Sequence, residues 1–203
     1  MTFYQIAFLF FTYSFLGWVG EVVFTAAVRR KYQDRGVLSG PLCILYGIGG
    51  LGTVKAGEML VHAAVASGKF GNSILFFGFE RQGAPVTSYV RLGDEKIRPK
   101  NQVYHPNCTL VLDPSLLISA PVFEGLTENS FFIVNTKVEN GADLVTNPNV
   151  KCAAWLDATS IALEMLSRPI TNTIMLGAFT KATGWVDKDE LEKVIGRFFG
   201  AKN

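Results

Sequence analysis

Apolar side chains dominate the start of the chain. Residues 3–20 are all uncharged and mostly apolar, and as a helix they would span roughly 27 Å, close to the ~30 Å hydrocarbon core of a bilayer. The run continues past Glu21 to residue 28, and the basic residues 29–31 follow at once. We therefore predict a transmembrane-like helix over residues 3–28, with its C-terminal flank in the cytoplasm.

A different pattern begins at residue 41, where short apolar runs of strand character are interleaved with runs of helical periodicity. The pattern predicts strands at 42–46, 73–77, 86–92, 109–112, 131–135 and 150–156. It predicts helices at 53–66, 158–166, 173–183 and 188–199. Strands interleaved with helices favour an α/β fold, a Rossmann-like and mainly parallel sheet with helices on both faces.

The length of 203 residues suits one domain plus a short appendage. We divide the chain into an N-terminal apolar helix with its basic flank, residues 1–40, and an α/β domain, residues 41–203. Residues 1–40 hold four basic and two acidic side chains, which equals the whole net charge of +2. The α/β domain is therefore neutral, and this argues against a nucleic-acid surface, which needs clustered Lys and Arg.

Side chains that could ligate a metal are scattered. Cys43, Cys108 and Cys152 lie far apart in apolar runs, and no Cys/His cluster accompanies them. This favours buried thiols over an iron–sulfur or zinc site. His62 falls inside a predicted helix and His105 in a loop, so the sequence predicts neither a catalytic residue nor a metal ligand on this chain.

Three polar residues follow predicted strands or precede a predicted helix. Asp113 and Asp157 end strands, and we expect each to cap the turn that follows. Asn172 stands just before the helix predicted from residue 173, where it can cap that helix or contact a ligand.

The turn between the first predicted strand and the first helix is rich in glycine. Gly47, Gly49 and Gly52 formally match the spacing of the dinucleotide-binding fingerprint, in which glycines let the backbone approach a phosphate at a helix N-terminus. The acidic residue expected about 20 residues further on is missing. A tight turn, or a phosphate-contacting turn of another kind, is therefore favoured over an NAD or FAD site.

The loop of residues 78–85 is polar and irregular and follows a predicted strand. It contains Glu80, Arg81 and Gly83. Arg81 could bind a carboxylate or phosphate through its two-pronged guanidinium. The alternative is that Glu80 and Arg81 form an internal charge network that fixes the loop.

The first fifty residues carry one resemblance. The segments that carry it are 15–18 (FLGW), 21–23 (EVV), 35–43 (RGVLSGPLC) and 46–47 (YG). They resemble the start of the ABC-transporter type IV membrane family, whose further spans are absent here. This resemblance implies a fused or misjoined fragment, which would act as a tether or be an accident of gene rearrangement.

The rest of the chain carries a second and longer resemblance. Its segments are Gly49-Gly50, Gly52, Gly68-Lys69, Phe77-Gly78, Glu80-Arg81, Gly83–Val86, Ile97-Arg98, Gln102–Pro106, Val111–Leu117, Val134–Thr136, Asp157–Thr159, Ile161-Ala162, Pro169–Thr173, Leu176–Ala178 and Lys181–Gly184. In this order they resemble the gamma subunit of the 2-oxoacid:ferredoxin oxidoreductases, of the pyruvate type. One departure is that Ile48 and Leu51 replace an Arg and a Gln of that family's glycine turn.

The second resemblance implies a subunit that is not catalytic alone. Thiamine diphosphate, Mg²⁺ and [4Fe–4S] clusters are expected on alpha, beta and delta-type partner subunits, which pass electrons to ferredoxin. This chain would shape the pocket for coenzyme A and the subunit interfaces in a cytoplasmic complex, with residues 3–28 as an optional contact to the membrane. The residues implied at the pocket or interface are Gly47, Gly49, Gly50, Gly52, Glu80, Arg81, Gly83 and Asn172. A membrane-protein fragment and an inactive fusion product are the alternatives.

Overall fold

The computed structural model describes residues 42–48, 51–77 and 85–200. The chain divides into two compact units, residues 1–39 and 40–203, and all described residues belong to the second. The predicted helix over residues 3–28 lies outside them. None of the helices in the described ranges combines the length and the apolar character needed to cross a membrane.

Within the described residues, six strands form one mixed sheet in the order β2-β3-β1-β4-β5-β6. The strands are β1 (Leu42–Ile48), β2 (Phe70–Phe77), β3 (Pro85–Gly93), β4 (Cys108–Val111), β5 (Ser130–Asn135) and β6 (Val150–Leu156). Strands β1, β4, β5 and β6 pair in parallel, whereas β3 is antiparallel to both β1 and β2.

The prediction of a mainly parallel sheet therefore holds for β1, β4, β5 and β6 and is wrong for the two pairings of β3. Only residues 78–84 connect β2 to β3, and a parallel pair needs a crossover of about a dozen residues or more. The first strand also continues two residues beyond its predicted end, because Gly47 and Ile48 pair with Val86 and Pro85.

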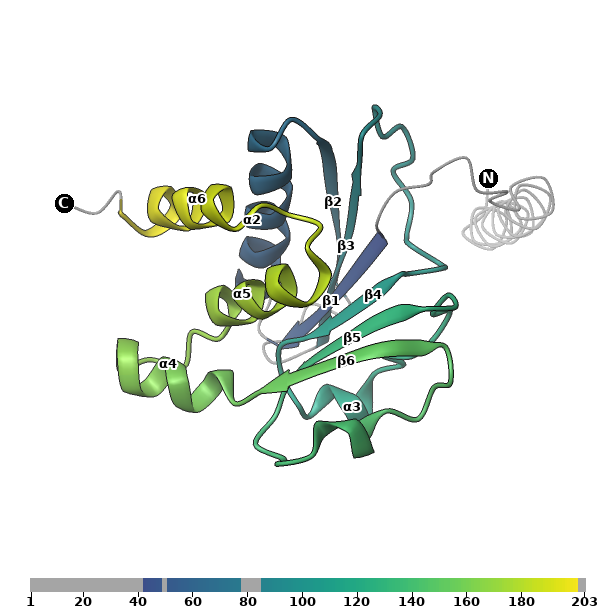
Figure 1. Ribbon diagram of the computed structural model, residues 1–203, viewed down its shortest axis with the longest axis vertical. Helices are drawn as coiled ribbons and strands as arrows, with labels where there is room; N and C mark the ends of the chain where they lie inside the picture. Colours follow the sequence, from purple (N-terminus) through teal and green to yellow (C-terminus); the bar gives the residue numbers. More distant parts are fainter. Residues whose placement is uncertain (1–41, 49–50, 78–84, 201–203) are drawn as a thin grey trace, which may run out of the picture. The chain divides into compact units, whose positions relative to one another are not determined.

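Long helices cover one face of the sheet and short elements cover the other (Figure 1). The helices are α2 (Leu51–Ala66), α3 (Leu116–Ser119), α4 (Ala158–Leu166), α5 (Asn172–Thr183) and α6 (Lys188–Gly200), with a 3₁₀ turn, η1 (Gly141–Leu144). Helices α2, α5 and α6 pack on one face, and α3 with neighbouring loops packs on the other. The prediction of helices on both faces is thus confirmed only in part, because the one described helix on the second face, α3, is four residues long.

The alternation of side chains along β1 builds the core on both faces. Cys43 and Leu45 pack under α2, while Ile44 and Tyr46 face α3, as the two-residue period of a strand requires. Apolar residues of α2 at helical spacing complete the first cluster; they are Ala56, Met59, Leu60, Ala63 and Ala64. The sheet therefore has a fixed register, and the carboxyl ends of its parallel strands are held at one edge.

The cysteines are free thiols in the described structure. Cys43 and Cys108 are fully buried, as expected, whereas Cys152 is half-buried. Burial raises the pKa of the Cys108 thiol, so this group stays protonated and packs as a small apolar side chain.

Candidate functional site

A pocket of about 490 Å³ lies at the carboxyl ends of β1, β4 and β5. Strand β1 leads into α2 on one face of the sheet, whereas β4 leads toward α3 on the other face. Connections that leave to opposite faces open a crevice between neighbouring parallel strands, and ligands of α/β sheets bind there. The lining residues are Gly47, Ile48, Gly52, Thr53, Lys55, Leu112, Asp113, Pro114, Asn135, Thr159, Pro169, Ile170, Thr171, Asn172, Phe198 and Phe199.

Of the described helices, α2, α4 and α5 begin at this pocket. Their first-turn residues Thr53, Thr159 and Asn172 line it. The first N–H groups of a helix have no partner within it, and the helix dipole adds positive potential at that end. The pocket therefore favours a ligand that carries negative charge, such as a phosphate.

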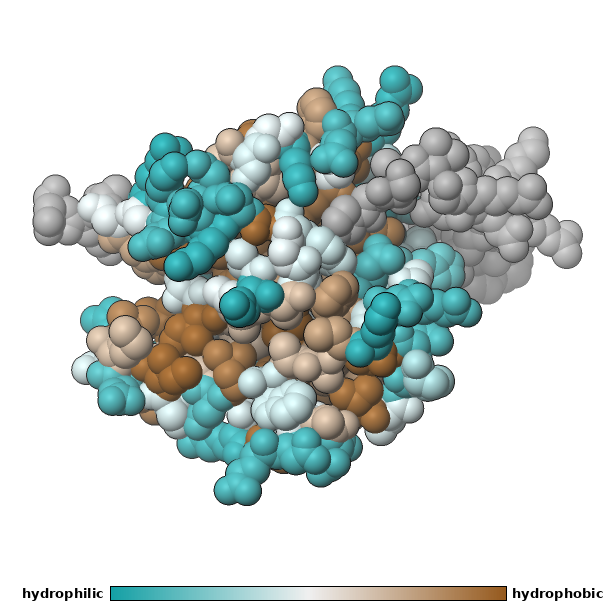
Figure 2. Space-filling view, in the orientation of Figure 1, coloured by the Kyte–Doolittle hydropathy of each residue, from teal (hydrophilic) through white to brown (hydrophobic). Residues whose placement is uncertain are grey.

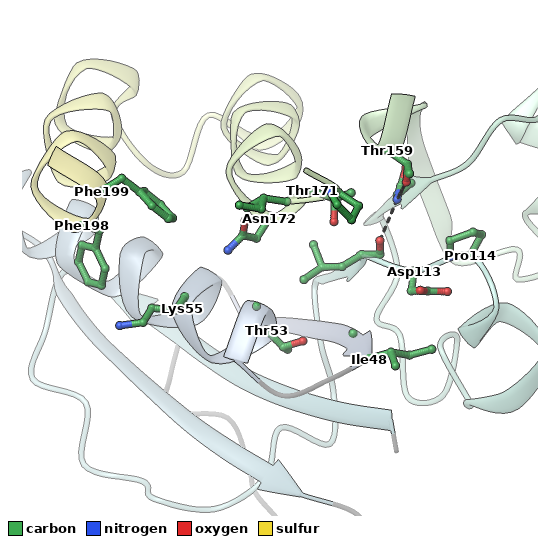
Figure 3. Close-up of a pocket in the computed structure, with 16 residues that line it drawn as sticks. Ile48, Thr53, Lys55, Asp113, Pro114, Thr159, Thr171, Asn172, Phe198 and Phe199 are labelled. Carbon is green, nitrogen blue, oxygen red and sulfur yellow. Dashed lines mark hydrogen bonds between the residues drawn. The ribbon is translucent and has the colours of Figure 1, made fainter. Parts of the chain in front are cut away.

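The Thr53 hydroxyl supplies a second, independent sign of a ligand. Thr53 is 1% exposed, and its Oγ1 has no hydrogen-bond partner among the described residues. A buried hydroxyl without a partner costs about 1–3 kcal/mol. The oxygen lies over Gly47, where a Cβ at residue 47 would overlap it. The absence of a side chain at Gly47 thus leaves room for the hydroxyl at the edge of the pocket (Figure 3).

Asn135 holds two walls of the pocket together. Its Nδ2 donates to the Leu112 carbonyl oxygen at 2.9 Å and to Thr159 Oγ1 at 2.9 Å. Its Oδ1 accepts from the Ala158 backbone N–H at 3.0 Å. Asn135 is 3% exposed, and these bonds use both of its amide hydrogens and its amide oxygen. Asn135 therefore fixes the end of β4 against the start of α4.

The two aspartates that end strands cap the turns that follow, as predicted. Asp113 Oδ1 accepts from the Ser115 backbone N–H at 2.9 Å and from its hydroxyl at 2.6 Å. Asp157 Oδ1 accepts from the Ser160 N–H at 2.9 Å, at the start of α4. The pKa of Asp157 is lowered, first by its bond with the Ser160 side chain.

One end of the pocket is aromatic and cationic. Phe198 and Phe199 come from the last turns of α6, and Lys55 comes from α2 (Figure 3). The Lys55 Nζ lies 5.3 Å from the centroid of the Phe198 ring, within range of a cation–π contact. Among the described lining residues, Lys55 is the one base and Asp113 the one acid.

The structure brings together some of the residues predicted from sequence. Gly47, Gly52 and Asn172 line one pocket, while Gly49, Gly50, Glu80, Arg81 and Gly83 lie outside the described residues. Asn172 is the first residue of α5, and its own Oδ1 accepts from the Thr173 N–H at 3.0 Å. Its amide nitrogen has no partner in the described structure and remains a donor for a ligand.

Sequence patterns did not predict a place at the site for Thr53, Lys55, Asn135, Thr159 or the two phenylalanines of α6. Thr53 stood directly after the glycine turn, where a helix N-terminus was already predicted. The adjacent phenylalanines also indicated that one of the two rings lies away from the core. Neighbouring residues on a helix point in different directions and cannot share one buried face. His62 and His105 are exposed, and in the described residues no three His, Cys, Asp or Glu side chains gather in a way that could hold a metal.

Fold and pocket together define an α/β protein with a site suited to a phosphate-bearing ligand at the edge of its sheet. A model of the pyruvate ferredoxin/flavodoxin oxidoreductase family matches residues 43–203. The chain belongs to this family.

Individual relatives agree with that assignment. The chain is 46% identical over 157 residues to pyruvate synthase subunit PorC of Methanothermobacter marburgensis, covering 77% of this chain and 85% of that protein. It is 45% identical over 159 residues to the pyruvate/ketoisovalerate oxidoreductases common subunit gamma of Thermococcus litoralis, with the same coverage. These matches confirm the resemblance to a gamma subunit.

A solved structure agrees as well. The crystal structure of the pyruvate oxidoreductase subunit PORC from Thermotoga maritima superposes with a TM-score of 0.68 at 34% identity, covering 79% of this chain and 85% of that one. The family match begins at residue 43, and the resemblance of residues 1–50 to a membrane family stays a prediction.

Proposed function

We propose that this chain is the gamma-type subunit of a complex that oxidises pyruvate or a related 2-oxoacid. The complex would convert the 2-oxoacid and coenzyme A into acyl-coenzyme A and CO₂, and pass two electrons to ferredoxin. The names of its relatives, pyruvate synthase and pyruvate/ketoisovalerate oxidoreductases, support this class of substrate. Thiamine diphosphate, Mg²⁺ and [4Fe–4S] clusters would be held by alpha, beta and delta-type partners in the cytoplasm.

The observation that carries the proposal is the buried Thr53 hydroxyl, which has no partner in the described part of the chain, in the lining of the phosphate-favouring pocket. Coenzyme A carries its phosphates at one end and its reactive thiol at the other. In our account the Thr53 hydroxyl donates to a phosphate oxygen, as do backbone N–H groups in the first turn of α2. The Asn172 amide nitrogen adds a further donor. These bonds are charge-assisted and stronger than bonds between neutral groups.

The chain's own role is then to bind and orient coenzyme A, while the bond-breaking steps occur on the partners. The 2-oxoacid loses its carboxylate as CO₂, the acyl group is oxidised by two electrons, and it forms a thioester with the thiol of coenzyme A. Holding the phosphates at a rigid sheet edge places the thiol for that last step, since fixed geometry removes entropy from a reaction between two molecules.

An apolar surface supports docking onto partner subunits. Large apolar side chains of α4 are exposed, among them Leu163, Met165 and Leu166, and Figure 2 shows apolar side chains gathered over this helix. Exposed apolar patches on soluble domains commonly mark interfaces. We propose that α4 lies against another subunit of the complex.

The test is reconstitution from separately produced subunits. Partners combined with this chain should reduce ferredoxin in the presence of pyruvate and coenzyme A, and partners without it should lose the dependence on coenzyme A or the activity itself. Equal activity with and without the chain would end the proposal. A transporter fragment or an inactive fusion product predicts that no thiamine- and cluster-containing complex co-purifies with it.

A further inference from the structure

The two phenylalanines at the end of α6 have different surroundings. Phe198 packs against α2, where its ring meets the His62 ring edge-on at a centroid distance of 5.6 Å and lies under the Lys55 ammonium. Phe199 is 49% exposed and lines the pocket. Packing thus accounts for Phe198, whereas the face of Phe199 is presented to whatever the pocket holds (Figure 3).

The chemistry of the pocket changes in a fixed order along its length (Figure 3). Phe199 and Lys55 lie at one end, and Thr53 and Asn172 stand between the two ends, at helix N-termini. Apolar Ile48 and Pro114 lie at the other end, together with the Asp113 carboxylate that the following turn already engages. A ligand with an aromatic base, then phosphates, then an uncharged arm matches this order.

We propose that Phe199 stacks on the adenine base of coenzyme A and so sets the direction in which the molecule lies. This inference rests on the proposed function. The Lys55 ammonium then pairs with the phosphate of the ribose, and the diphosphate lies at Thr53 and Asn172. The pantetheine arm leaves past Ile48 and Pro114 with its thiol leading. Stacking on an aromatic side chain suits a base because every base presents a flat π-face.

The experiment measures competition against coenzyme A in the reconstituted complex with two fragments. Adenosine 3′,5′-bisphosphate carries the base, and 4′-phosphopantetheine carries the arm. Phe199→Leu keeps an apolar side chain without a ring, and we expect it to raise the inhibition constant of the base-bearing fragment about tenfold. The constant of the arm fragment should not change. Phe199→Trp should keep the parental constants for both fragments.

Phe76→Leu is the matched control, because Phe76 on β2 is 48% exposed and lies outside the lining of the pocket. It should change neither constant. An unchanged constant for adenosine 3′,5′-bisphosphate in Phe199→Leu, or an equal loss for both fragments, would overturn the stacking. Thr53→Ala shows whether the stacking of Phe199 alone is wrong or whether coenzyme A does not bind in this pocket. If it weakens coenzyme A binding while Phe199→Leu does not, the pocket stands and the orientation is wrong. If neither variant weakens binding, the proposed function of the pocket is wrong too.

Discussion

The Thr53 hydroxyl lies over Gly47, in the space that a side chain at residue 47 would occupy. Gly47 is the penultimate residue of β1, and Thr53 lies in the first turn of α2. Their contact sets how closely the start of the helix approaches the end of the strand. Since both residues line the pocket, the same contact shapes the place where we expect a phosphate.

The first prediction concerns this contact. Gly47→Ala should destabilise the chain by about 1–3 kcal/mol, as overpacking does, because the new methyl group overlaps the hydroxyl. Thr53→Ala should relieve most of this loss in the double variant, and Thr53→Ser, which keeps the hydroxyl, should not. Urea unfolding of the parent, the three single variants and the two double variants gives the coupling energy of each pair. Additive effects of Gly47→Ala and Thr53→Ala would show that the contact is not the cause.

The second prediction concerns Asn135. Its replacement by Ala leaves the Leu112 carbonyl and the Ala158 N–H without their partner and should cost about 2 kcal/mol or more. Asn140→Ala is the control, since Asn140 is exposed and bonds only to Asp143 in the described structure. That change should stay within about 0.5 kcal/mol. Equal midpoints of urea unfolding for the two variants would contradict the bridging role.

A third prediction concerns pH and Asp157. Its bonds with Ser160 lower the pKa of this carboxyl in the folded state. A lowered folded-state pKa contributes stability above the unfolded-state pKa of about 4, and this contribution is lost as the pH falls through the folded-state value. Unfolding at pH 7 and at a pH below about 4 should therefore show a larger loss of stability for the parent than for Asp157→Asn.

The asparagine in that variant keeps a capping oxygen but cannot titrate, so its stability at pH 7 should be close to the parent's. Asp157→Ala, which has no capping group, should be less stable than Asp157→Asn at both pH values. Identical pH dependence of the parent and the asparagine variant would show that the titration of Asp157 does not contribute.

The fourth prediction concerns the exposed face of α4. Met165 is 76% exposed, so Met165→Glu should change the stability of the chain by no more than about 0.5 kcal/mol. In the complex, a buried and unpaired carboxylate would be costly, and the variant should fail to assemble. Glu164→Gln on the same helix is the control. Size-exclusion chromatography of co-expressed subunits measures assembly. Normal assembly of the Met165→Glu variant would show that the interface lies elsewhere.

Much of the fold was predictable because its elements carry strong local signals. Strand β6 and helix α4 begin and end where the pattern predicted, since Val150–Leu156 is a short, mostly apolar run and Asp157 marks the start of the helix. Helix α3 was missed because it spans only four residues after Asp113-Pro114, too few to show a period. The antiparallel β2–β3 pair could have been predicted from the short connection of residues 78–84. The pairing of β3 with β1 joins strands far apart in the chain, and the residues of one strand do not reveal it.

The site was predictable only in part, for a related reason. The glycine turn predicted a helix N-terminus beside a strand, and Gly47 and Gly52 do line the pocket. Nothing local links Phe199, near the end of the chain, to Thr53, because α6 reaches the pocket by packing on α2 and α5. The Thr53 hydroxyl likewise becomes buried, without a partner among the described residues, only when the chain folds.

The most direct test of the account is the KM for coenzyme A of the complex carrying Thr53→Ala, set beside the complex carrying Thr53→Ser. Loss of a hydrogen bond to a charged phosphate should raise this KM about tenfold or more in the alanine variant. The serine variant should keep a KM near the parent's, and the KM for pyruvate should not change in either. An alanine variant with the parental KM for coenzyme A would contradict the claim that this pocket binds coenzyme A through its phosphates.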